Sequence, residues 1–169
     1  MTSTYPYSTP LMYTHMEDKV SCNKETESDC NTMWNYLNNS TCYDIFKCII
    51  LKANMSELFK NPCYSYTLFA PKDSCLSNIN LNDIDKSIAI QIVKASLLDD
   101  KIPSEILLMN NISYYSTLNP VQKLLISNNN GLLFINANSP DCIHIKEVDI
   151  MTENGIIHTT NNLIIPYIV

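Results

Sequence analysis

The second half of the chain consists of short apolar runs separated by turn-forming residues, and this pattern constrains the fold most strongly. Six runs rich in β-branched and aromatic residues follow residue 111: ISYYSTL, KLLISN, GLLFINAN, CIHIKEVDI, GIIHTTN and LIIPYIV. Between them lie NP, NNNG, NSPD and ENG, which are typical of turns and hairpins. Runs of this length and spacing predict a meander of strands.

The first half of the chain predicts helices instead. In residues 41–59 apolar side chains recur at helical spacing, with Ser40 or Thr41 as the N-cap. Residues 82–98 predict a second helix capped by Asn82. Helices followed by strands indicate an α+β domain, with a β-sandwich or wedge core and the helices packed at one side.

Shorter elements complete the predicted order. One strand, YSYTLFAP, lies between the two helices and is followed by a short helix that begins at Asp73. A helical turn is expected over residues 104–109. We expect about seven short strands in total.

The chain is long enough for one domain with a hydrophobic core. Residues 1–31 are rich in Ser, Thr, Tyr and charge without a clear period, which predicts a partly ordered arm. Residues 32–169 would then form the domain. The first residues lack the pattern of a signal peptide. The sequence contains no run of about 18 apolar residues, so it predicts no membrane-spanning helix.

Charge and residue usage narrow the possible functions. The net charge is −6 and the chain contains no arginine, which argues against nucleic acid and against phosphate chemistry. Asn and Ile are frequent, as expected of an AT-rich genome such as that of a protist or a large DNA virus. Four glycosylation sequons, at Asn38, Asn39, Asn54 and Asn111, are about as many as chance predicts.

The sequence does not predict an enzyme, a metal site or a cofactor. Seven cysteines, an odd number, form no CxxC pair, and no P-loop or dinucleotide fingerprint is present. We expect mostly buried or semi-buried thiols, although a local disulfide such as Cys22–Cys30 would be possible in an oxidising environment. His144 and His158 lie on predicted strands without an acidic or Cys partner nearby, so a hydrolase or redox protein with a Cys-His pair is the weaker alternative.

Two segments resemble a known family. YTLFAPKDSCL, from Tyr66 to Leu76, resembles the first conserved block of fasciclin (FAS1) domains, usually TLFAPTDEAF. ENGIIHTTNNLIIP, from Glu153 to Pro166, resembles their second block, usually TNGVIHVIDKVLLP. The two blocks occur in the family's order and spacing, and the resemblance covers about residues 31–169. It implies a FAS1-like β-wedge joined to N-terminal helices.

Within these blocks the resemblance implies structural roles. Thr67 to Ala70 would form a buried strand that Pro71 ends, so that Asp73 caps the next helix. Asn154-Gly155 would form a tight turn that requires positive φ. His158 would be a buried strut, and Leu163 to Ile165 would supply a closing strand. The structural residues implied are Thr67, Leu68, Phe69, Ala70, Pro71, Asp73, Asn154, Gly155, His158 and Pro166.

The resemblance also implies adhesion, because members of this family are surface or extracellular modules that bind proteins such as integrins, glycans or matrix. One motif proposed in animal members, EPDIM, is matched here by EVDIM. The candidate binding residues are therefore Glu147, Asp149, Ile150 and Met151. The alternative is that Asp149 only makes a turn or loop hydrogen bond.

A second motif of the family, a Tyr-His pair flanked by branched aliphatics, is replaced here by Asp99-Asp100, so the resemblance does not extend to binding of that type. The resemblance places the protein outside the cell, at its surface or on a virion, with a surface protein, matrix protein or glycan as partner. Since no leader is recognised, synthesis in the cytoplasm, as in a viral factory, is also open. The alternative function is a structural component of a virion or cell surface without a discrete ligand.

Overall fold

The computed structural model describes residues 31–167, so that the predicted arm lies almost entirely outside the described residues. The predicted α+β class is confirmed, with β1 and β2 placed among the helices and the other six strands after them. The helices are α2 (Met33–Asn39), α3 (Asp44–Lys52), α4 (Ser56–Lys60), α5 (Lys86–Ala95) and α6 (Ser104–Leu108), with two 3₁₀ turns, η1 (Asp73–Cys75) and η2 (Leu81–Asp83).

Eight strands, rather than about seven, form two four-stranded sheets in this part of the chain. They are β1 (Tyr66–Pro71), β2 (Leu97–Leu98), β3 (Ile112–Ser116), β4 (Lys123–Asn129), β5 (Leu132–Ile135), β6 (Ile143–His144), β7 (Ile150–Thr152) and β8 (Gly155–Thr160). The first sheet has the order β2-β1-β8-β7 and the second the order β3-β4-β5-β6. Only the central pair, β1 with β8, is parallel.

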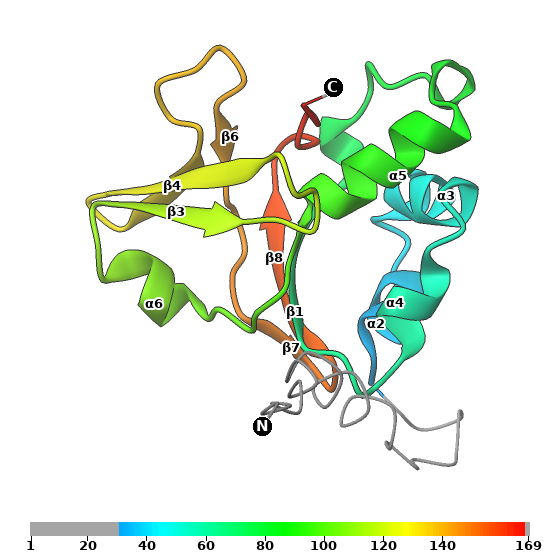
Figure 1. Ribbon diagram of the computed structural model, residues 1–169, viewed down its shortest axis with the longest axis horizontal. Helices are drawn as coiled ribbons and strands as arrows, with labels where there is room; N and C mark the ends of the chain where they lie inside the picture. The colour runs from blue at the N-terminus through cyan, green and yellow to red at the C-terminus, as the bar shows by residue number, and fades with distance from the viewer. Residues whose placement is uncertain (1–30, 168–169) are drawn as a thin grey trace, which may run out of the picture.

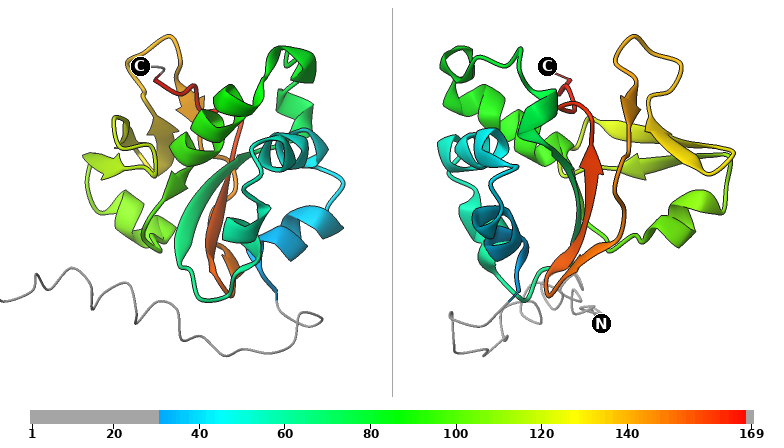
Figure 2. Two further views of the ribbon diagram at one scale, coloured as in Figure 1. Left: turned by 45° about the vertical axis from the view of Figure 1, so that its right-hand side comes forward. Right: turned by 180° about the vertical axis from the view of Figure 1, so that it is seen from behind.

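The first sheet lies between the helices and the second sheet (Figures 1 and 2). Helices α2 to α5 cover one side of β1 and β8, and the β3–β6 sheet lies on the other side. Both faces of the two central strands are therefore covered, and every residue of β1 and β8 is buried. This explains why β1, YTLFAP, is almost continuously apolar rather than alternating. The second half of β8 is polar but also buried.

Two apolar cores result from this layering. Leu68 and Ala70 of β1 pack with the helices, together with Phe46 and Ile92. Phe69, which points to the opposite face, packs with the second sheet. The two cores stabilise the domain through burial of apolar area, the dominant favourable contribution to folding.

The helical stretch predicted over residues 41–59 is two helices, α3 and α4. They are separated by residues 53–55, where Asn54 adopts a left-handed conformation with φ 56°. Asn is among the few residues that tolerate this region, so the break lies at a position where the sequence permits it.

The caps of the two long helices differ from the predicted ones. Tyr43, not Ser40 or Thr41, precedes α3. The cap of α5 is Asp85, whose side chain accepts a hydrogen bond from the Ile88 backbone N–H. Asn82 lies instead in the separate 3₁₀ turn η2, so the predicted second helix is shorter than residues 82–98 at both ends.

The closing segment predicted as a strand is not one. Residues 163–167 have no strand structure, although Leu163 and Ile164 are buried, the first in the helical core and the second between the sheets. The segment therefore contributes side chains to both cores without pairing in either sheet. The run CIHIKEVDI, in contrast, contributes to two strands, β6 and β7.

The prediction of mostly buried or semi-buried thiols is wrong for the free cysteines in the described part of the chain. The free cysteines there, Cys42, Cys48, Cys75 and Cys142, are exposed. Cys63 is disulfide-bonded.

Candidate binding surface

The EVDIM segment forms a bulge beside β8. Ile150 pairs with Ile157 and Ile145 pairs with Thr160, so that four residues, 146–149, lie opposite only His158 and Thr159. Two extra residues thus loop out of the strand, as in an extended β-bulge. The backbone of Thr159 still holds the near end of the loop through hydrogen bonds with Lys146 and Glu147.

Asp149 turns the chain within this bulge and anchors a helix. Its φ is 60°, a left-handed conformation that Asp tolerates better than most residues. Its carboxylate accepts hydrogen bonds from the Ser104 backbone N–H at 2.7 Å and from the Ser104 hydroxyl. Because Ser104 is the first residue of α6, Asp149 satisfies a backbone donor that the helix leaves open.

Partial burial raises the pKa of the Asp149 carboxyl, but the two hydrogen bonds from Ser104 lower it more, so that the pKa lies below its ordinary value. Asp149 is therefore an anion at neutral pH. Sequence reasoning missed Ser104, and its position directly after a proline, at the start of a helix, is the one signal that could have indicated it.

His158 links the bulge to the loop before α6. The side chain is completely buried. Its Nδ1 accepts a hydrogen bond from the Asp149 backbone N–H at 3.2 Å, and its Nε2 lies 2.9 Å from the Ile102 carbonyl. The proton is therefore on Nε2, which donates to Ile102.

Burial lowers the pKa of the His158 imidazole, and the Ile102 carbonyl and the charge of Asp149 oppose this only in part. Both ring nitrogens are occupied by backbone groups. Neither is available to act as a general base.

Thr67 holds the same loop from the β1 side. Its hydroxyl accepts a hydrogen bond from the Ile102 backbone N–H at 2.8 Å and donates one to the Asp100 carbonyl at 2.6 Å. The loop that carries Asp99-Asp100 is thus fixed to both central strands, by Thr67 of β1 and His158 of β8. Sequence reasoning assigned Thr67 to a buried strand but gave no sign of this contact.

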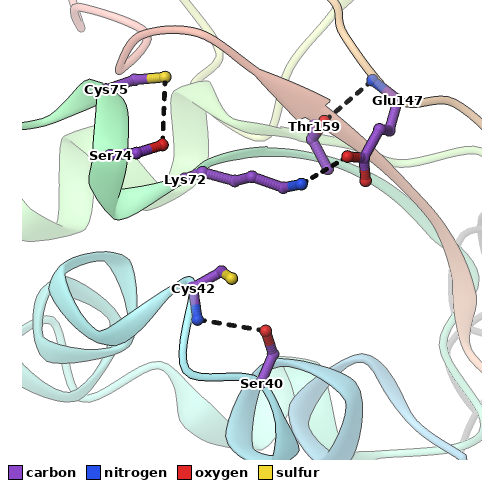
Figure 3. A network of polar contacts seen from close by, with 7 residues as sticks. All are labelled: Ser40, Cys42, Lys72, Ser74, Cys75, Glu147 and Thr159. Atoms are coloured by element: carbon purple, nitrogen blue, oxygen red, sulfur yellow. Dashed lines mark hydrogen bonds and ion pairs between the residues drawn. The ribbon is translucent and has the colours of Figure 1, made fainter.

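Glu147 forms an ion pair across the first sheet. Its carboxylate lies 2.5 Å from Nζ of Lys72, the residue that follows β1, and its backbone N–H donates to the Thr159 hydroxyl (Figure 3). Both charged side chains are partly exposed. Such pairs contribute only about 0–1 kcal/mol, so this ion pair adds little to the stability of the bulge.

The remaining residues of the segment differ in exposure. Met151 is 53% exposed on the edge strand β7, whereas Ile150 is half-buried against the helical core. Val148, at the tip of the bulge, is 39% exposed. Glu147, Asp149 and Met151 are thus all exposed, but the Asp149 carboxylate is hydrogen-bonded to Ser104. Ile150 is the one predicted binding residue that packs against a core.

Val148 is part of an exposed apolar patch, which we call the bulge surface and define as Leu108, Leu132 and Val148. These three side chains line a hollow of about 230 Å³, together with Ser104, Lys146 and others. They come from α6, β5 and the bulge, and the Asp149–Ser104 contact holds two of these elements together. Leu108 and Leu132 carry no motif that sequence reasoning could have recognised.

The second sequence block also contains the two residues at the start of β8, Asn154 and Gly155. Asn154 is completely buried, and its amide accepts from the Met33 backbone N–H and donates to the carbonyls of Phe59 and Asn61. Gly155 has φ +146°, and a Cβ there would lie 1.9 Å from the Tyr66 carbonyl oxygen. Only glycine fits such a conformation at such a close approach.

Asp73 caps a different helix from the one predicted. Its carboxylate makes no cap to its own turn η1. It accepts hydrogen bonds from the backbone N–H groups of Asp44 and Ile45 at 2.8 and 2.9 Å, at the start of α3. The residue is a helix cap, as its position after a strand indicates, but it acts on a helix earlier in the chain.

Pro71 ends β1 as a buried residue, and Pro166 is buried near the end of the described chain. The Gln122 side chain holds the backbone on both sides of Pro166. Its amide donates to the Ile165 carbonyl, and its Oε1 accepts from the Tyr167 backbone N–H, both at 3.0 Å. Gln122 lies in no motif, so sequence reasoning did not identify it.

Within residues 31–167, no group of three or more His, Cys, Asp or Glu side chains is arranged to hold a metal ion. Every helix described falls short of the length and hydrophobicity required to cross a lipid bilayer.

The fold is that of a known class of domain. A FAS1 domain pair from fasciclin I, an insect cell adhesion molecule, superposes with a TM-score of 0.66 at 16% sequence identity, covering 79% of this chain and 50% of that one. At this identity the likeness concerns the fold alone. The β-wedge with N-terminal helices is thus the FAS1 fold.

Sequence comparison identifies the family. The chain matches the fasciclin domain over residues 38–166, and it belongs to the fasciclin domain family. Transforming growth factor-beta-induced protein ig-h3 of the pig, Sus scrofa, is 26% identical over 137 residues. These cover 80% of this chain but only 19% of that protein. The resemblance carried by the two sequence blocks is thereby confirmed.

Proposed function

We propose that the protein is a non-enzymatic binding and adhesion module at the surface of a cell or particle. It recognises a surface protein, matrix protein or glycan through the bulge surface and the adjoining segment Glu147 to Met151. The observation that carries the proposal is the exposed apolar patch of Leu108, Leu132 and Val148, which lines one hollow. Contiguous exposed apolar side chains beside polar ones are typical of interaction sites.

The contacts beneath this patch support the proposal. Asp149 fixes α6 through Ser104, and His158 fixes both the bulge and the preceding loop. A surface held in this way loses little conformational entropy when a partner binds. Asp149 therefore acts as a positioning residue, whereas Val148 and Met151 make the contacts and Glu147 contributes a charge at the rim.

The proposal is tested by capturing partners from surface-labelled cell extracts on the immobilised protein. Val148→Asp places a charge on the patch and should abolish capture of a specific partner. Leu51→Asp is the matched control, because Leu51 is 57% exposed on α3, in the helical layer. Equal capture by Val148→Asp and the wild type would contradict the proposed surface. If the wild type captures no partner at all, a structural component without a discrete ligand becomes the better account.

A further inference from the structure

The outer face of the second sheet forms another surface. Outward residues of its strands include Tyr114 of β3, Lys123 of β4 and Phe134 of β5. In the antiparallel register Tyr114 lies opposite Leu125 of β4, and Phe134 lies opposite Ser127 of β4. The helical layer lies on the opposite side of the molecule (Figure 2). Among the described residues, no helix covers this face.

Two hollows lie on this face. One has a volume of about 440 Å³ and the other about 430 Å³, and Asn138, in the loop between β5 and β6, lines both. Neither shares a lining residue with the hollow of the bulge surface. Each volume lies in the range of small-molecule sites, about 300–1,000 Å³.

The linings combine aromatic rings with amides. Tyr114 and Tyr167, which are 70% and 56% exposed, line the first hollow, and Phe134 lines the second. The amide side chains are Asn136 and Asn138 in the first, and Asn111, Asn128, Asn129 and Asn138 in the second. The charged residues of the two linings are one lysine, Lys123, and one aspartate, Asp141, so that the formal charges cancel.

Much of the hydrogen-bonding capacity of this face is unused within residues 31–167. The side chains of Lys123, Asn138 and Asp141 and the hydroxyl of Tyr114 make no hydrogen bond there. Polar groups that line a hollow and lack partners are available to a ligand that both donates and accepts hydrogen bonds.

We propose that this face binds a neutral oligosaccharide, with sugar units in the two hollows. A pyranose ring has apolar C–H faces, which stack on exposed aromatic rings, and a rim of hydroxyls, which pair with amides and carboxylates. The cancelling charges and the lack of arginine disfavour sulfated or phosphorylated chains. This site is distinct from the bulge surface, and each can fail without the other.

The test is direct binding of defined tetrasaccharides to the whole protein, measured by saturation-transfer NMR and calorimetry. The neutral probes are those of glucose, mannose, galactose and N-acetylglucosamine, and the anionic probe is a heparin-derived tetrasaccharide. Tyr114→Ala removes one stacking ring and should weaken the best neutral probe about tenfold. Tyr114→Phe keeps the ring face and should bind within about twofold of the wild type.

Val148→Asp, which alters only the bulge surface, should leave tetrasaccharide binding unchanged. Because Tyr114 is mostly exposed, its replacement should not unfold the domain, and circular dichroism checks this. The proposal is overturned if no neutral probe binds at millimolar concentration, or if the heparin-derived probe binds more tightly than all of them. Unchanged binding by folded Tyr114→Ala would equally overturn it.

Discussion

Asn154 connects three parts of the chain through one buried amide, and Asn154→Ala should therefore be costly. The substitution leaves the Met33 N–H and the Phe59 carbonyl without these hydrogen bonds. The Asn61 carbonyl retains a second bond, from the Tyr64 N–H. Each buried group left unpaired costs about 1–3 kcal/mol, so that we expect a loss of about 2–6 kcal/mol in the free energy of unfolding.

Urea unfolding can measure this loss, with Trp34 as the reporter. Trp34 is the only tryptophan in the chain, and it lies on α2, the helix whose first residue Asn154 holds. Its fluorescence therefore follows release of α2, while circular dichroism follows the whole domain. The expected decrease in melting temperature is roughly 5–20 °C for a chain of this size.

A matched control is Asn78→Ala, which removes an exposed amide without a hydrogen bond. Its midpoint should remain within about 0.5 kcal/mol of the wild type. If Asn154→Ala also shifts the unfolding free energy by less than about 1 kcal/mol, with an unchanged denaturant slope, then the amide does not hold the layers together.

Three other outcomes are expected. The pKa of His158 in the folded chain is lowered from 6.5, so the unfolded chain binds a proton at higher pH than the folded chain, and stability should fall as the pH drops below 6.5. His158→Gln should make the melting temperature depend less steeply on pH in this range. An unchanged dependence would contradict the reasoning. Gly155→Ala should prevent folding or reduce soluble yield sharply. Gly131 also has a positive φ, but a Cβ there would meet no atom within 4 Å, so Gly131→Ala should cost only about 1–2 kcal/mol in urea unfolding. Equal costs would show that the close approach at Gly155 is unimportant. Asp73→Ala should cost about 1 kcal/mol in the same assay, and Asp73→Asn, which keeps an acceptor oxygen, should cost less.

Local sequence signals predicted those parts of the fold that local chemistry controls. The buried run of β1, the glycine at Gly155 and the break at Asn61-Pro62 all follow from side-chain size and backbone freedom. Two blocks of sequence also indicated the family, because their order and spacing are specific. The second block also placed His158 on a strand, but it did not indicate that the imidazole contacts the backbone of Asp149 and Ile102.

Long-range contacts account for what the sequence could not predict. The carboxylate of Asp73 acts on a helix 28 residues earlier, and that of Asp149 on a helix 45 residues earlier. Neither contact is indicated by a local pattern in the sequence. The bulge itself results from a mismatch in length between two paired segments, which becomes visible only when their register is known. Likewise, no sequence pattern indicates the hydrogen bonds that Gln122 and Ser104 make in the folded chain.

Cell adhesion to wells coated with the whole protein tests the central claim most directly. We expect a panel of eukaryotic cells to include one that adheres to the wild type more strongly than to blocked wells. Adhesion of that cell should persist on Leu51→Asp and fall to the level of blocked wells on folded Val148→Asp. If no cell adheres, or if adhesion to Val148→Asp equals that to the wild type, adhesion through the bulge surface is contradicted.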